Sequence, residues 1–477
     1  MSAAARLVLA AIVATSAAAS RAHAQPPPGT SPPEAHGVIP RDLVSGSGGD
    51  RSGGTPEPPP AEPAPEPPPA GTTTEVWREP TPPLDLGYHL LNLPEYVIEL
   101  ALTPFEFTVG LVQRYRVDKR VYDLLRNDAG TIRVSPNVKF SGGDGFGVGA
   151  ALKLEGLLER EEELSIGGLI RLDRDYETRV RFEQKVARLD GRQISAEVHY
   201  ELDQNLKYYG LGNQTEQSDK RVIDERALDV EAAMDILSGV LWNSGGKIEF
   251  GYRRNRLASG SETGVTPLGE DGDMVVPTAD FDGDRHNYAR GAVSLYRDTR
   301  DRIGRSTTGT FSEVEIGATA GLDKSDLGAA SLRANVTGFI PLLPLYRVLV
   351  LNAGVAAVGR LTTGDDVPLR NMVLLDRKHG LRGYSTGRFR DQFGWWASAE
   401  YRYPIWEYQD TGVAMSPALF VDTGQVGGRV QDLVDAAPKW SVGGGLRIEH
   451  ETRLIMVVEV GWSPEGYEVG FDLGKDF

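Results

Sequence analysis

The chain has 477 residues, a formal net charge of −16 and 40% hydrophobic residues. It contains no cysteine, which excludes disulfides, thiolate metal sites, cysteine nucleophiles and covalently attached haem. The acidic balance argues against nucleic acid as a partner, because phosphate binding needs a basic surface. No apolar run approaches the roughly 18 residues that a membrane-spanning helix needs, which excludes a helical inner-membrane protein but not a barrel of alternating strands.

Residues 1–24 are predicted to be a secretory signal peptide. Arg6 supplies a positive charge, Leu7 to Ala19 form a short apolar stretch, and Ala22-His23-Ala24 is a small-x-small cleavage site. A buried N-terminal helix is the alternative interpretation. Residues 25–83, which follow, are dominated by Pro, Gly, Ser, Thr and Glu, and are therefore predicted to be a disordered linker.

Residues 84–128 differ from the linker and are predicted to be a short helical segment. Apolar residues recur at helical spacing from Leu91 to Leu102, Pro104 interrupts them, and a second helix is expected over Phe105 to Leu125. In one interpretation this segment caps the mouth of a barrel or lies on the inner leaflet. In the other it is an ordinary packed lead-in helix.

From residue 129 to residue 477 the pattern is typical of strands. Segments of about ten residues alternate polar with apolar side chains, as in Arg179–Val186, Lys247–Arg253 and Thr310–Ile316, and turn-rich gaps separate them. We count about sixteen such segments, an even number as in bacterial membrane barrels. We therefore predict an all-β fold, a 16-stranded transmembrane antiparallel β-barrel; a soluble exported β-sandwich is the alternative.

One long gap, residues 360–392, stands out because it contains Lys378-His379-Gly380-Leu381-Arg382-Gly383-Tyr384. Counting strands makes it the sixth outer loop, and strands with Glu400 and Asp422 follow it. Three other motifs occur in order along the chain: Tyr208-Tyr209-Gly210-Leu211-Gly212-Asn213, Asp298-Thr299-Arg300-Asp301 and Gly443-Gly444-Gly445-Leu446-Arg447. Together they resemble the BamA/TamA (bacterial surface antigen) family of outer-membrane barrels.

The resemblance implies that the loop folds back into the barrel with Leu381, Arg382, Gly383 and Tyr384 at its tip. It also implies that Arg382 pairs with Glu400 and Asp422 on the inner wall, a structural or gating role. Electrostatics favours this pairing, because a guanidinium in a partly desolvated lumen needs a carboxylate partner. Gly383 permits close backbone approach. An exposed loop arginine is the alternative.

The end of the chain resembles the signal that the barrel-assembly machinery reads when it inserts such proteins. The residues of this signal occupy alternate positions near the end of the chain, and the last of them is aromatic: Tyr467, Val469, Phe471, Leu473 and Phe477. We therefore expect this machinery and outer-membrane lipids as partners. The expected location is the outer membrane of a Gram-negative type bacterium, with the linker in the periplasm.

By function, the resemblance implies a role in inserting or translocating proteins (or lipids) at the outer membrane. Relatives carry POTRA domains before the barrel, whereas no segment here has the length and strand–helix pattern of one. A separate periplasmic protein is then expected to supply clients. The alternative is a passive pore or structural barrel that has lost the assembly role.

We expect no enzyme activity and no cofactor, because the sequence lacks the phosphate-loop, nucleophile-elbow and His-Glu-x-x-His motifs. No metal site is expected either. The acidic stretch from Asp280 to Asp284 either holds a hard cation or is a solvated turn, and it lacks the full calcium-loop pattern.

Overall fold

The computed structural model describes residues 127–473. Short gaps fall at residues 128–130, 142–144, 157–161, 173–174, 187–191, 237–242, 263–264, 266–279, 282, 324–326, 343–346, 364–366, 409–412 and 451–452. The predicted signal peptide, the Pro-rich linker and nearly all of the helical segment 84–128 lie outside the described residues.

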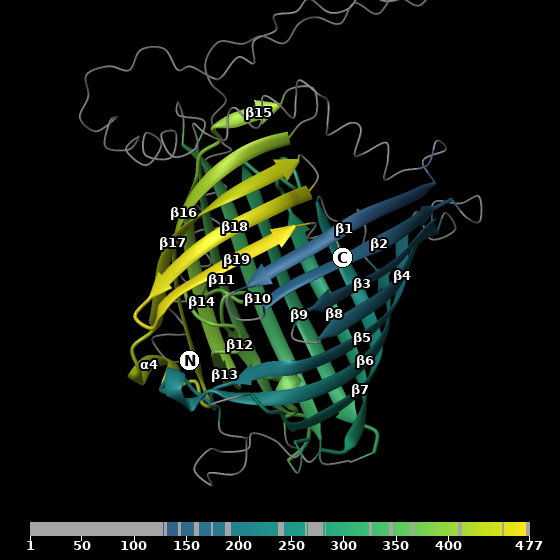
Figure 1. Cartoon of the computed structure of the whole chain (residues 1–477), viewed down its shortest axis with the longest axis vertical. Helices are drawn as coiled ribbons and strands as arrows, with labels where there is room; N and C mark the ends of the chain where they lie inside the picture. Colours follow the sequence, from purple (N-terminus) through teal and green to yellow (C-terminus); the bar gives the residue numbers. More distant parts are fainter. Residues whose placement is uncertain are drawn as a thin grey trace, which may run out of the picture.

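The described chain forms a sixteen-stranded antiparallel, nearly closed barrel, which confirms the predicted fold class (Figure 1). The barrel strands are β1 (Ile132–Ser141), β2 (Gly145–Glu155), β3 (Glu162–Arg171), β4 (Tyr176–Val186), β5 (Arg192–Tyr208), β6 (Arg221–Asp235), β7 (Ser244–Ser259), β8 (Arg285–Asp298), β9 (Gly309–Gly321), β10 (Gly328–Leu342), β11 (Arg347–Arg360), β14 (Phe393–Arg402), β16 (Val413–Gly427), β17 (Lys439–His450), β18 (Arg453–Ser463) and β19 (Gly466–Leu473).

Five short elements complete the fold. They are the 3-10 turns η2 (Gln217–Asp219) and η3 (Leu369–Asn371), the strands β12 (Val373–Leu375), β13 (Phe389–Asp391) and β15 (Trp406–Tyr408), and the helix α4 (Asp432–Asp435). Strand β15 extends the main sheet by pairing with β16, whereas β12 and β13 form a separate small hairpin.

The alternation of side chains explains why these segments form a barrel. Along β7, Phe250 points outward and is 63% exposed, whereas Lys247 and Glu249 lie inside and form an ion pair. Outward side chains on neighbouring strands are also apolar and exposed, as at Ile316 and Val293. An apolar outside and a charged inside are the pattern of a barrel that lies in lipid and encloses a polar lumen.

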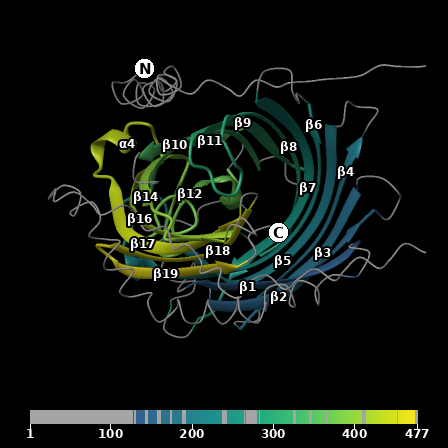
Figure 2. The ribbon, with the colours of Figure 1, turned by 90° about the horizontal axis from the view of Figure 1, so that it is seen from above.

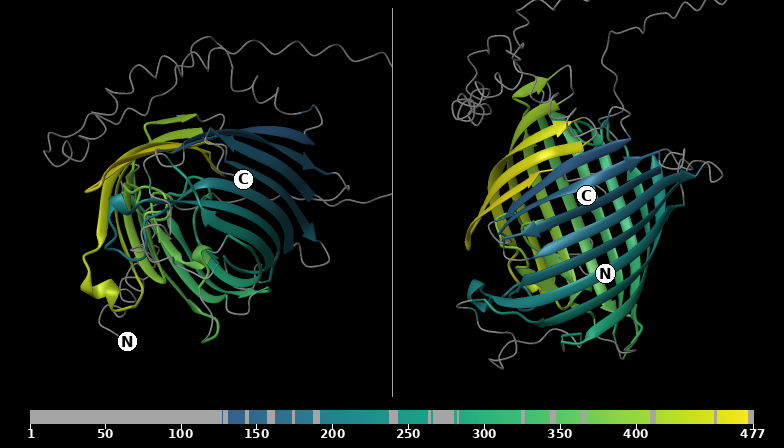
Figure 3. Two further views of the ribbon diagram at one scale, coloured as in Figure 1. Left: turned by 60° about the horizontal axis from the view of Figure 1, so that its bottom comes forward. Right: turned by 45° about the vertical axis from the view of Figure 1, so that its right-hand side comes forward.

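The strands run obliquely around the barrel, as Figure 3 shows from two sides. Strand β1 begins at one end, which we call the turn end because short connections close it. The opposite end, the loop end, carries the connection 361–392 between β11 and β14. This connection is the sixth at the loop end in chain order, as predicted, and we call it loop 6.

The barrel closes at a seam, where β1 meets β19. Within the described residues, which end at Leu473, four residue pairs join the two strands, from Val138 with Leu473 to Ser141 with Gly470. Strand β1 forms ten pairs with β2 on its other side. Within the described residues, the turn-end part of β1 from Ile132 to Asn137 has no partner on β19.

Candidate functional site

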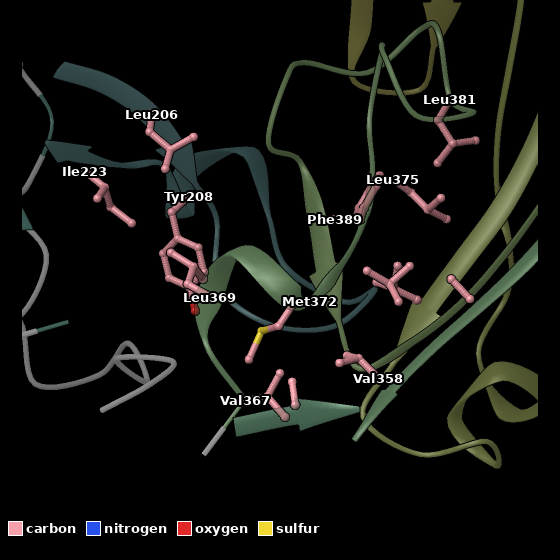
Figure 4. Packing of buried hydrophobic residues seen from close by; sticks show 14 of the residues in the cluster. Leu206, Tyr208, Ile223, Val358, Val367, Leu369, Met372, Leu375, Leu381 and Phe389 are labelled. Atoms are coloured by element: carbon pink, nitrogen blue, oxygen red, sulfur yellow. The ribbon is translucent and has the colours of Figure 1, made fainter. Parts of the chain in front are cut away.

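Loop 6 lies inside the lumen, where Figure 2 shows its hairpin strand β12 within the ring of barrel strands. A buried apolar cluster attaches it to the wall near the loop end (Figure 4). The loop contributes Val367, Leu369, Met372, Val373, Leu375, Leu381, Tyr384 and Phe389, and the wall contributes Leu206, Tyr208, Ile223, Leu257, Ala329, Ala356, Val358 and Val426. Each large apolar side chain buried in this way stabilises the loop by about 1.5–3 kcal/mol.

Arg382 reaches the inner wall and binds both of the carboxylates named from the sequence. Its Nε and Nη2 donate to the two carboxylate oxygens of Asp422 at 3.0 and 2.7 Å, and its backbone N–H donates to Asp422 at 3.0 Å. Its Nη1 donates to Glu400. A two-pronged contact of this kind fixes orientation as well as charge, which a lysine could not do.

The guanidinium of Arg382 is also enclosed by its neighbours. Its Cζ lies 3.5 Å from the centroid of the Phe420 ring, and its Nη2 donates to Ser398 Oγ at 3.1 Å. A third carboxylate, Glu459, accepts from Nη1 at 3.3 Å. The aromatic face and the hydrogen-bond acceptors offset the free energy that the guanidinium loses when it leaves water.

The charge cluster continues toward the turn end through two further arginines. Arg402 donates to the second oxygen of Glu400 at 2.6 Å, and Arg447 donates to Glu449 at 2.8 Å. Arg447 also lies 3.7 Å from Glu400. Glu400 is therefore shared by three arginines. Among the ion pairs of the described residues, Asp422 pairs with Arg382 alone.

The loop tip passes against strand β18 at a distance that only glycine permits. A Cβ atom on Gly383 would lie 2.7 Å from Ser441 Cβ and 2.8 Å from the Trp462 carbonyl oxygen. On the opposing strand, a Cβ on Gly461 would lie 2.6 Å from the Arg382 carbonyl. Two facing glycines thus let the backbone of the loop touch the backbone of the wall.

The two other tip residues pack rather than bind charge. Leu381 is fully buried, and Tyr384 is 2% exposed with its ring edge-on to Phe389 at 5.0 Å between centroids. Both side chains thus belong to the apolar cluster that joins loop 6 to the wall.

A capping aspartate that the sequence analysis did not single out holds the tip in shape. Asp376 accepts hydrogen bonds from the backbone N–H of Lys378 at 2.9 Å and of Gly387 at 2.8 Å, and pairs with His379 Nδ1 at 2.7 Å. Burial alone raises the pKa of Asp376, but the hydrogen bonds from His379 and Gly387 outweigh it and hold that pKa below its ordinary value.

Three other side chains that bind loop 6 to the wall were not predicted from the sequence. Arg370 donates to Glu225 on β6 at 2.7 Å, across the lumen from Asp422. Arg388 is fully buried, and its Nε and Nη2 donate hydrogen bonds of 2.7 and 2.8 Å to Glu465, in the turn between β18 and β19. Ser385 donates to Glu468 on β19. An arginine in a loop has no sequence signal that separates a buried anchor from an exposed one.

The motifs that carried the resemblance lie around this site. At the loop end of β5, Gly212 donates its N–H to the Arg390 carbonyl of loop 6 at 2.9 Å, and Asn213 donates to the Ala437 carbonyl at 3.0 Å. The segment Asp298–Asp301 forms the turn between β8 and β9 at the turn end, closed by Gly309 at φ +96°. The glycines of β17 leave room for the inward Phe420 ring, which a Cβ on Gly443 would meet at 2.4 Å.

The residues of the predicted C-terminal signal lie on the last strand. Tyr467 is 74% exposed on the outer face, and Val469 and Phe471 follow at alternate positions of β19. Leu473 is the register partner of Val138 at the seam. Phe477 lies outside the described residues.

Of the acidic stretch, Asp280 is buried and accepts a hydrogen bond from the Tyr288 hydroxyl at 3.3 Å, while Asp282 lies outside the described residues. Within the part of the chain that is described, no group of three or more His, Asp or Glu side chains is placed to hold a metal ion. No described helix is long and apolar enough to cross a membrane.

Comparison with solved structures agrees with the geometry. The fold is similar to BamA from Haemophilus ducreyi lacking POTRA domains 1–3, with 16% identity, a TM-score of 0.52, and coverage of 72% of this chain and 70% of that chain. CdiB from Acinetobacter baumannii and CdiB from Escherichia coli each share 10% identity with it, at TM-scores of 0.44 and 0.47. The alignments cover 72% and 71% of this chain but 59% and 62% of those chains. At 16% identity, the similarity to the BamA structure shows the fold alone.

No curated protein sequence matches the chain. The profile of the Omp85 superfamily domain, however, matches residues 166–476, from within β3 to the penultimate residue. The resemblance to BamA/TamA barrels is confirmed, and this chain belongs to the Omp85 superfamily.

Proposed function

We propose that this barrel takes part in inserting or translocating proteins (or lipids) at the outer membrane, and that it does so without catalysis. Outer-membrane residence follows from the superfamily barrel. The proposal orients the turn end, with the N-terminal linker, toward the periplasm and the loop end toward the outside. The observation that carries it is the seam, with four residue pairs among the described residues where β1 and β2 share ten.

A strand edge without a partner attracts another strand. From Ile132 to Asn137, β1 offers backbone C=O groups and, except at Pro136, N–H groups that β19 does not bind within the described residues. Such an edge pairs with an added strand through its main chain, whatever the side chains are. In this proposal a client strand or the bilayer itself is engaged there, at the periplasmic half of the membrane.

Loop 6 supports this action by stiffening the opposite side of the seam. Its anchors Arg382, Ser385 and Arg388 bind β16, β19 and the turn before β19. Opening the seam then breaks the four backbone pairs of the described residues, while β19 stays held by the loop. The seam can open without loss of the folded barrel.

Partners follow from the same reasoning. In this proposal a separate periplasmic protein delivers clients to the turn end. The barrel-assembly machinery inserts the barrel itself by reading its last strand, β19. Outer-membrane lipids cover the apolar outer face.

The test is site-specific photo-crosslinking in living cells at two matched outward positions. Val134 lies on the part of β1 that has no β19 partner among the described residues, and it is 39% exposed. Val180 lies on β4 between two paired strands and is 42% exposed. A photoreactive amino acid at position 134 is expected to capture exported polypeptides, and one at position 180 is expected to capture only lipid. Equal capture at the two positions contradicts the proposal.

A second function, passive conduction, is favoured by the ion-paired inner wall away from loop 6. Arg179 and Glu197 lie 3.2 Å apart there with side chains 28% and 26% exposed, as in a wet lumen. A conducting pore gives long, steady current steps in planar bilayers, whereas a barrel filled by loop 6 gives small and erratic ones. Steady steps from the purified chain would favour the pore.

A further inference from the structure

Three arginines lie directly opposite one another on the outer face of the barrel. Arg226 on β6 is the register partner of Arg256 on β7, which is in turn the partner of Arg285 on β8. We call these three residues the arginine ladder. They share the outward face with Val230 and Phe250, which are 40% and 63% exposed further along β6 and β7.

This placement is unfavourable by itself. Opposite residues on antiparallel strands have Cβ atoms only about 4.5–5.5 Å apart, and like charges at that distance repel. Arg254, two residues along β7, adds a fourth positive charge on the same face. Arg226 is 3.8 Å from Asp224, and Arg256 donates to the Gly283 carbonyl at 2.7 Å. Asp284 and Asp323 lie beside Arg256 and Arg285, so four arginines face three described carboxylates.

The depth of the ladder in the membrane is marked by tyrosines. Tyr176, Tyr200 and Tyr252 lie on the outer face of β4, β5 and β7, and the rings of the first two are 5.7 Å apart. Tyr252 lies four residues from Arg256 along β7. Outward tyrosines of this kind form a girdle at the membrane–water interface. The ladder lies just beyond the girdle, at the depth of lipid headgroups.

A hollow adjoins the ladder at the loop end. It has a volume of about 540 Å³, and its lining includes Arg256, Arg285 and His286 together with Asp284 and Asp323. Arg226 and Arg285 are exposed and Arg256 is half-buried, so guanidinium groups are accessible from the membrane side.

We propose that the arginine ladder binds the phosphate groups of a phosphorylated glycolipid in the outer leaflet. Phosphate matches the planar fork of arginine, and a doubly charged group bridging two guanidiniums turns their repulsion into attraction. The inference rests on the orientation proposed above, with the loop end outside. It does not depend on the seam.

The test uses the full chain in dodecyl maltoside micelles, titrated with diphosphoryl lipid A and followed by native mass spectrometry. The ladder variant Arg226→Gln/Arg285→Gln removes two exposed charges. The control Arg302→Gln/Arg429→Gln removes two exposed charges elsewhere, in the turn after β8 and the loop after β16. We expect the ladder variant to retain lipid A at least tenfold more weakly and the control to stay within twofold of the parent.

A third variant, Arg226→Lys/Arg285→Lys, keeps the charge and loses the fork, so intermediate retention is expected even if the glutamine variant folds poorly. Equal retention by the ladder and control variants overturns the proposal. Complete displacement of lipid A by millimolar inorganic phosphate assigns the ladder to free phosphate and also overturns it. Lipid A binding without client capture at position 134 would leave the ladder standing and remove the proposed function.

Discussion

Replacing Arg382 by methionine tests the charge cluster in loop 6 most sharply. The substitution keeps the length of the side chain but leaves Asp422 and Glu400 without this partner. Glu400 retains Arg402 at 2.6 Å, whereas Asp422, 1% exposed, retains the Ser441 hydroxyl at 3.2 Å and the backbone N–H of residue 382. The cost therefore falls mainly on Asp422.

Removing one partner of a buried ion pair typically costs about 3–5 kcal/mol, because a charge stays behind without compensation. We expect Arg382→Met to lower the free energy of unfolding by that amount. The matched control is Arg179→Met, whose partner Glu197 is 26% exposed and whose loss should cost only about 0–1 kcal/mol.

The assay is urea unfolding of the purified barrel in micelles, followed by tryptophan fluorescence and by the heat-dependent shift on gels. A double-mutant cycle with Asp422→Asn, which removes the stranded charge, should give a coupling energy of about 1–3 kcal/mol. If Arg382→Met costs no more than Arg179→Met, or if the cycle shows no coupling, the reasoning about the buried pair is wrong.

Two further predictions concern the fit of the tip and the turn end. Gly383→Ala should destabilise the barrel by about 1–3 kcal/mol in the same urea assay, because the new Cβ would lie 2.7 Å from Ser441 Cβ. The control is Gly338→Ala on β10, which has open space around it and should be nearly neutral. At the turn end, the hydrogen bond from Arg305 lowers the pKa of Glu407. This pair therefore stabilises the fold at neutral pH. Its contribution is lost as the pH falls below the ordinary glutamate pKa of about 4.3 and through the lowered pKa of Glu407. The stability difference between the parent and Glu407→Gln should therefore shrink on going to acid pH; a constant difference would contradict the pairing.

The barrel and the loop tip could be predicted because their signals are local or ordered along the chain. Alternating segments indicate strands, and their number fixed which connection was loop 6. Arg382, Glu400 and Asp422 were named because their order along the chain matched a family in which such a triad meets. The structure brings these three side chains together.

The remaining anchors could not be predicted because nothing local distinguishes them. Arg388 and Glu465 are 77 residues apart, and Arg370 and Glu225 are 145 residues apart. Each is an ordinary charged residue until the barrel closes. The extent of pairing between β1 and β19 could not be predicted either, since it depends on register and not on composition.

The most direct test of the central claim locks the seam. The chain has no cysteine, so a pair can be introduced without background. Phe140→Cys/Phe471→Cys joins register partners across the seam, and Phe140→Cys/Phe146→Cys joins register partners of β1 and β2 as a control. Each variant is expressed in cells that lack the parent protein, and outer-membrane and secreted proteins are quantified by mass spectrometry.

We expect the control pair to restore the protein profile, the seam pair to fail to restore it under oxidising conditions, and a reductant to recover it. Full restoration by the oxidised seam pair would contradict the claim that this protein acts through its seam.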